Sequence, residues 1–179
     1  MELLRKINWS FVLLCFVVML CSSFTNSKSI LKKVKKEISK VFVIEDFDLD
    51  PVIIEQNKNL FSDFSNNRLL KISIENKLLG YAYLGTAPSK TETFEYLVLF
   101  DNNFIIKKAK VLLYRESWGG EIGSNRWLKQ FVQKDTTHEF KYRENISAIS
   151  GATISVKSMT NAINQLLSSL SFLIQKKIL

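Results

Sequence analysis

LLKISI (residues 69–74) and LLGYAYLG (78–85) are two runs of apolar, β-branched and aromatic residues separated by a short polar turn. EYLVLF (95–100) and FIIKKAKVLLYRE (104–116) repeat this arrangement on either side of the polar turn at 101–103. Strand-forming residues flanking a short polar turn are typical of β-hairpins, whose strands are antiparallel. The sequence therefore predicts two hairpins, and these decide the fold class.

Two helices are predicted to follow the hairpins. The glycine-rich loop SWGGEIG (117–123) leads to Ser124, a residue type that caps helices, and a short helix is predicted over 125–133. A long helix is predicted over about 154–174, where apolar residues recur at helical spacing. Its apolar stripe consists of Met159, Ile163, Leu166, Leu170 and Leu173. The predicted fold class is α+β: antiparallel hairpins packed on a long C-terminal helix and a short helix, with a helical N-terminal arm.

Residues 1–27 have the pattern of a targeting segment. Arg5 and Lys6 precede an apolar core at 11–21, which is shorter than the ~20 residues that a membrane-spanning helix needs. A signal peptide is the first interpretation, an uncleaved membrane anchor the second, and a lipoprotein start at Cys21 the third. Each predicts export of the rest of the chain to the periplasmic or extracytoplasmic face of a bacterial membrane.

The positive charge is concentrated next to this segment. The 179 residues carry a net charge of +8, and residues 28–40 hold six lysines and one glutamate, so +5 lies there and +3 elsewhere. We expect residues 28–68 to be a lysine-rich helical arm and linker, with a helix over 29–42 that packs on the domain or lies on an anionic membrane surface. IEDFDLDP (44–51) is expected to be an edge strand or an extended linker. The body lacks a basic stripe interleaved with aromatic residues, so no nucleic-acid partner is expected.

The reactive side chains of the body are few. Cys15 and Cys21 both lie in the leader, so the body offers no disulfide, no nucleophilic thiolate and no thiolate metal site. His138 is the single histidine, which excludes a two-histidine zinc site. We therefore assign neither catalytic nor metal-binding residues, and any redox chemistry must come from a cofactor.

AISGATIS (148–155) lies where an extended segment turns into the long helix. The amide groups at a helix start and the positive end of the helix dipole attract phosphate. Gly151 and Ala152 leave the approach open, and Ser150, Thr153 and Ser155 offer hydroxyl groups. The alternative is an ordinary helix cap made by a serine or threonine side chain.

ISGATISVKSMTNAIN (149–164) and VLLYRESWGGEIGSNRWLKQF (111–131) resemble the FMN-binding domain family. This family includes flavin-carrying periplasmic subunits of the Rnf and sodium-translocating NADH:quinone oxidoreductase complexes, and standalone exported flavoproteins. The resemblance implies that residues 69–179 are an FMN-binding domain and that Thr153 carries FMN through a phosphoester bond. A flavin transferase would make this bond from FAD with Mg²⁺. Gly119 and Gly120 would lie close to the flavin. Trp118 and Tyr114 are candidates either to flank its ring or to belong to the core, as aromatic residues near a hairpin end often do.

One position departs from the family pattern. The family usually has an aspartate three residues before the motif, where this chain has Ser147. This difference leaves three alternatives open. The flavin is attached covalently, with Glu144 as a substitute carboxylate; FMN is bound without a covalent bond; or the domain carries no flavin. Three cations of the body are candidates for the phosphate or the ring carbonyls, or for a solvated surface: Arg115, Arg126 and Lys157.

The function implied by the resemblance is electron transfer. We expect an exported, membrane-associated flavoprotein, or a subunit of a redox complex, rather than a stand-alone catalyst. Its partners would be a membrane surface or membrane redox complex, the flavin transferase and other electron carriers. The alternatives are an extracytoplasmic flavoreductase for a small acceptor and a flavin-free sensor or binding module of the same fold.

Overall fold

The computed structural model describes residues 28–56 and 58–179, and its contacts divide the chain into residues 1–37 and 38–179. A helix covers residues 28–42, as predicted for the lysine-rich arm. The predicted signal peptide or anchor at 1–27 lies outside the described residues. Among the described helices, none combines the length and the apolar character needed to cross a bilayer.

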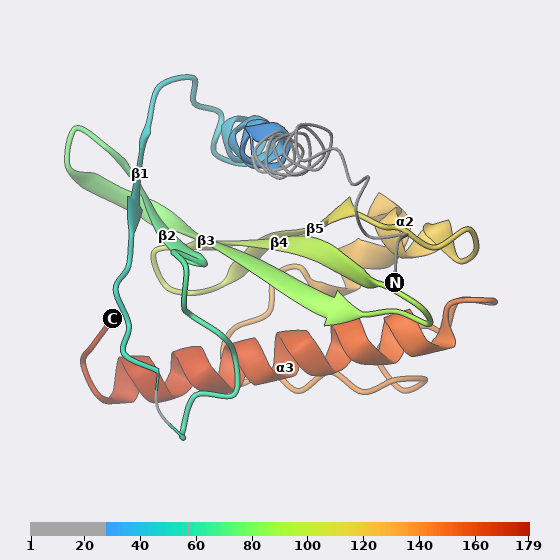
Figure 1. Cartoon of the computed structure of the whole chain (residues 1–179). Helices are drawn as coiled ribbons and strands as arrows, with labels where there is room; N and C mark the ends of the chain where they lie inside the picture. Colours follow the sequence, from blue (N-terminus) through green and yellow to red (C-terminus); the bar gives the residue numbers. More distant parts are fainter. Residues whose placement is uncertain (1–27, 57) are drawn as a thin grey trace, which may run out of the picture. The chain divides into compact units, whose positions relative to one another are not determined.

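Five antiparallel strands form one sheet in the order β1-β2-β3-β4-β5 (Figure 1). The two predicted hairpins are confirmed, and β3 and β4 join them into a single meander, with pairs running from Gly80–Asp101 to Pro88–Thr93. The sheet and its helices confirm the α+β class. The strands are β1 (Asp48–Pro51), β2 (Leu69–Ile74), β3 (Lys77–Pro88), β4 (Thr93–Asp101) and β5 (Ile106–Leu113).

The acidic segment at 44–51 contributes the edge strand rather than a linker. β1 pairs with β2 from Asp48–Ser73 to Pro51–Leu70. An edge position tolerates Pro51, because a strand with only one neighbour does not need every backbone N–H for pairing.

β5 is shorter than the predicted run 104–116. Phe104 has φ +58° and belongs to the turn, where its N–H donates to the Asp101 carbonyl at 3.1 Å. The Asp101 carboxylate also accepts from the amides of Asn103 and Ile105, both at 3.0 Å. The aspartate side chain therefore extends the turn and delays the start of the strand.

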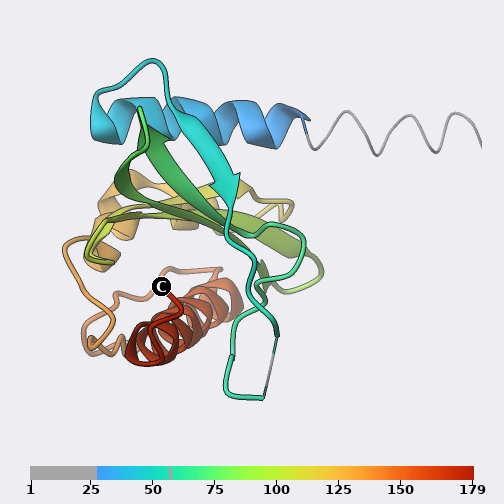
Figure 2. The ribbon, with the colours of Figure 1, turned by 90° about the vertical axis from the view of Figure 1, so that its left-hand side faces the viewer.

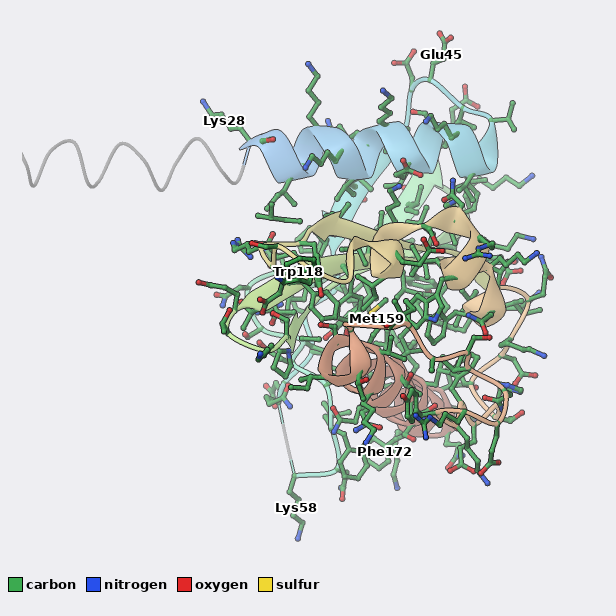
Figure 3. The ribbon with its side chains drawn as sticks, turned by 90° about the vertical axis from the view of Figure 1, so that its right-hand side faces the viewer. Lys28, Glu45, Lys58, Trp118, Met159 and Phe172 are labelled. Atoms are coloured by element: carbon green, nitrogen blue, oxygen red, sulfur yellow. The ribbon has the colours of Figure 1, made fainter. Side chains whose placement is uncertain are left out.

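α3 (Thr153–Gln175) runs along one face of the sheet and supplies most of the core on that side (Figures 1 and 2). The predicted apolar stripe is confirmed, because all five of its residues are fully buried. Met159 lies between α3 and the sheet in Figure 3. The long helix is thus fixed along its length, and its start at Thr153 is placed beside the ends of β3 and β5.

The glycine-rich loop and the short helix are built from three single turns. η2 (Gly120–Gly123), α2 (Asn125–Leu128) and η3 (Lys129–Phe131) replace the continuous helix predicted over 125–133. Ser124 caps α2 as predicted, with its Oγ accepting from the Trp127 amide at 3.2 Å. The helix ends early because the Gln133 N–H donates to the Ile106 carbonyl at 2.8 Å, which draws the chain onto β5.

Candidate functional site

The start of α3 is not capped by a side chain. Its N-cap residue is Ala152, and Gly151 before it has φ +74°. The first hydrogen bond into the helix runs from the Val156 N–H to the Ala152 carbonyl at 2.8 Å. The alternative that this segment is an ordinary serine or threonine cap is therefore wrong. An uncapped helix start leaves amide donors for an anion, as the motif predicted.

A cleft of about 390 Å³ opens at this helix start. It brings together five of the predicted site residues, namely Trp118, Gly151, Ala152, Thr153 and Ser155. Thr153 is exposed, so its hydroxyl is accessible from the cleft. The other lining residues are Lys90, Tyr114, Glu116 and Ile154. We call this cavity the Thr153 cleft.

Two aromatic residues line the Thr153 cleft, one of them held by neighbouring side chains and the other exposed to solvent. The Tyr114 hydroxyl lies 3.0 Å from the Ser155 hydroxyl, and Ser155 is buried, so this pair ties the chain after β5 to α3. The Tyr114 ring is held edge-on against Phe94 at 5.8 Å between centroids. Trp118 is 80% exposed and belongs to the end of the molecule that faces the viewer in Figure 3. The indole therefore offers a large apolar face for a planar ligand.

The two glycines of the loop have different structural roles. Gly119 has φ +75°, and a β-carbon there would lie 2.5 Å from the Ala152 Cβ. A β-carbon on Gly120 would meet nothing within 4 Å. A glycine is thus required at position 119, because a larger residue would collide with Ala152 of the motif. At position 120 the packing does not require a glycine. A role for either glycine in contacting the flavin stays a prediction.

Ser150 faces a different cavity from Thr153. It lines a cleft of about 670 Å³ together with the segment 147–149 and residues of the short helices, among them Arg126 and Lys129. The segment between the two cavities is held by its backbone at Ser147. The Trp127 indole N–H donates to the Ser147 carbonyl, and the Gln130 side-chain oxygen accepts from the Ser147 N–H, both at 2.8 Å.

The three cations considered from sequence do not line the Thr153 cleft. Arg115 pairs with Glu95, and Arg126 pairs with Glu121, each at 2.8 Å. The Lys157 ammonium lies 5.3 Å from the centroid of the Tyr142 ring. The lysine that does line the cleft is Lys90. Sequence reasoning missed it, because a lysine in a hairpin turn is ordinary.

Glu116 is an acid of the cleft with a strongly lowered pKa. Its carboxylate accepts from the Thr91 N–H at 2.7 Å, the Thr91 hydroxyl at 3.0 Å and the Glu92 N–H at 3.2 Å. These bonds to the turn, the Thr91 backbone bond first, lower the pKa of Glu116 to about 2. Glu116 is therefore a carboxylate at neutral pH, engaged with backbone donors.

In the part of the chain that the structure describes, no three His, Cys, Asp or Glu side chains gather in a group that could hold a metal ion. Residues 90–168 match the model of the FMN-binding domain family. No curated protein is similar enough to match this chain. The matched segment contains the uncapped helix start, both glycines and every residue of the Thr153 cleft.

Proposed function

We propose, from the match of residues 90–168 to the model of the FMN-binding domain family, that the chain is an exported, membrane-associated electron-transfer protein. The observation that carries the proposal is the exposed Thr153 at an uncapped helix start within an open cleft. Bound FMN supplies reversible one- and two-electron chemistry that the side chains of the body lack.

The residues of the Thr153 cleft fit a flavin phosphate. The first amides of α3 and its positive dipole end favour a phosphoryl group at Thr153. Gly151 and Ala152 bring no bulky side chain to this point, and the Tyr114–Ser155 pair fixes the wall beside it. Trp118 is positioned to cover the ring and limit its contact with water.

Covalent attachment needs a flavin transferase and FAD as donor. The Thr153 Oγ forms a bond to the FMN phosphorus of FAD, and the bond from that phosphorus to AMP breaks. AMP leaves, and the hydroxyl proton passes to a base of the transferase. The product is a phosphodiester that keeps one negative charge beside the helix start.

Export and membrane association rest on the sequence. The basic and apolar leader precedes the helix over 28–42, whose lysines suit an anionic surface. Other electron carriers or a membrane redox complex would then be the partners. Fractionation of cells that produce the full chain tests this arrangement, and recovery from the cytoplasm alone would contradict it.

Intact mass tests the covalent flavin. The full chain, produced with a flavin transferase, should gain the mass of FMN less water. Thr153→Val should lose this increment, since valine keeps the shape and removes the hydroxyl, while Ser150→Ala should keep it. An unchanged increment in Thr153→Val would place the flavin elsewhere. Purified protein without a flavin absorbance band would favour the flavin-free binding module.

A flavoreductase for a small acceptor is the second candidate. The 670 Å³ cleft favours it, because this cavity adjoins the motif and has room for a small molecule. Reoxidation of the reduced flavoprotein separates the two functions. Acceleration by one small molecule supports the reductase, whereas acceleration by protein carriers alone supports the electron relay.

A further inference from the structure

The turn between β3 and β4 places Lys90 at the Thr153 cleft and holds it there. Within the turn, the Ser89 N–H and hydroxyl both donate to the Glu92 carbonyl at 2.7 Å. The Glu116 carboxylate accepts three hydrogen bonds from Thr91 and Glu92. The lysine is thus carried on a turn with a fixed backbone.

A separate contact joins this turn to the start of α3. Ser158 lies in the second turn of α3, and its hydroxyl donates to the Pro88 carbonyl at the end of β3. The same Ser158 Oγ lies 3.0 Å from the Ser155 carbonyl oxygen. The turn and the Thr153 end of the helix are therefore positioned as one assembly, although they lie far apart in the sequence.

Lys90 is the cation of the Thr153 cleft, and its charge has no close partner in the described part of the chain. Every described ion pair involves other residues. The acid of the cleft lining, Glu116, uses its oxygens to accept hydrogen bonds from Thr91 and Glu92 of the turn. An exposed ammonium on a fixed turn, facing a cavity that also contains Thr153, is suited to an anionic group of the ligand.

We propose that Lys90 binds the phosphate of FMN and makes the Thr153 cleft selective for the phosphorylated flavin over riboflavin. This inference rests on the proposed function, because it takes FMN as the ligand of the cleft. Lys90 contacts the phosphate from the β3–β4 turn, and the first amides of α3 contact it from the helix. The phosphate is thus held between the sheet and the helix.

Binding to a protein that cannot form the covalent bond tests the role of Lys90. Full-length Thr153→Val protein, free of flavin, is titrated with FMN and with riboflavin, and quenching of flavin fluorescence reports binding. Adding Lys90→Gln should weaken FMN binding about tenfold, the effect of losing one charge-assisted hydrogen bond, and should change riboflavin binding less than twofold. Lys129→Gln removes the same charge from the other cleft and should change neither affinity.

Equal FMN affinity with and without Lys90 would overturn the proposal, and so would an equal loss for FMN and riboflavin. If the Thr153→Val protein binds neither flavin, the flavinylated wild-type chain is compared with flavinylated Lys90→Gln. The ³¹P resonance of the phosphodiester should then move with Lys90→Gln and stay in place with Lys129→Gln; an unmoved resonance refutes the contact. A wild-type chain that takes up no flavin in either form refutes the proposed function itself, and the role of Lys90 with it.

Discussion

Gly119 and Gly120 are adjacent, yet substitution by alanine should destabilise the protein at Gly119 and leave its stability unchanged at Gly120. A β-carbon on Gly119 would lie 2.5 Å from the Ala152 Cβ and 3.1 Å from the Ala152 Cα. Carbon atoms in favourable contact are separated by about 3.5–4.0 Å, so the backbone of the motif must move. The β-carbon on Gly120 would enter open space.

The size of the Gly119→Ala effect has two parts. The left-handed conformation at φ +75° costs a residue other than glycine about 1–2 kcal/mol. Forcing an additional carbon into a packed contact costs about 1–3 kcal/mol. The free energy of unfolding should therefore fall by about 2–5 kcal/mol, which corresponds to a Tm lower by roughly 4–20 °C for a domain of this size.

Gly120→Ala serves as the matched control. Its φ is not in the left-handed region, so alanine should leave the free energy of unfolding within about 0.5 kcal/mol. Urea unfolding followed by tryptophan fluorescence measures both values. Flavin incorporation should slow in Gly119→Ala, because Ala152 adjoins Thr153, and the difference should persist at a temperature where both variants are folded.

Equal stabilities of the two variants would refute the role assigned to the Gly119–Ala152 contact. Slower flavin binding in Gly120→Ala, with unchanged stability, would instead show that this glycine approaches the flavin, as the family resemblance implies. The pair of variants therefore separates packing of the loop on the motif from contact of the loop with the cofactor.

Two further predictions concern the hydrogen bonds that Trp127 and Gln130 make to the Ser147 backbone, called here the Ser147 clamp, and the carboxylate of Glu116. Gln130→Leu removes the acceptor of the Ser147 N–H, so hydrogen exchange at Ser147 should accelerate about fivefold while α3 is unaffected; unchanged exchange would show that the clamp does not order this segment. The pKa of Glu116 falls from 4.5 to about 2 on folding, so its stabilising contribution is complete above the unfolded value and is lost as pH falls through about 2. The difference in urea midpoint between wild type and Glu116→Gln should therefore shrink as pH is lowered from about 5 to about 2, and a difference that is independent of pH would contradict this assignment.

Features that depend on neighbouring residues were predictable from the sequence. The hairpins, the apolar stripe of α3 and the capping of α2 by Ser124 follow from spacing within a few residues, and the structure confirms them. Element ends were less predictable. β5 starts late because the Asp101 side chain extends the turn before it, and the short helix ends where a distant hydrogen bond joins Gln133 to Ile106.

The motif SGAT was also readable from the sequence, together with the position of Thr153 at the start of the last helix. The sequence alone left open whether a side chain caps that helix. It also placed Ser150 and Thr153 in one site, whereas the structure puts them on two cavities. Between these two residues the backbone passes through the left-handed conformation of Gly151, with φ +74°.

Only the tertiary structure decided which residues surround Thr153. Lys90 carries no local signal, since a lysine in an exposed loop is ordinary, and Glu116 has no partner carboxylate in the sequence pattern that would assign it a role. Lys90 reaches the cleft because the meander returns the β3–β4 turn to the start of α3, where Pro88 and Ser158 meet across seventy positions of sequence. Glu116 follows β5 and reaches the cleft by binding that turn at Thr91 and Glu92. Local periodicity thus fixes the hairpins, the helix and the motif, whereas the cleft forms only when the packing of α3 on the sheet brings these distant segments together.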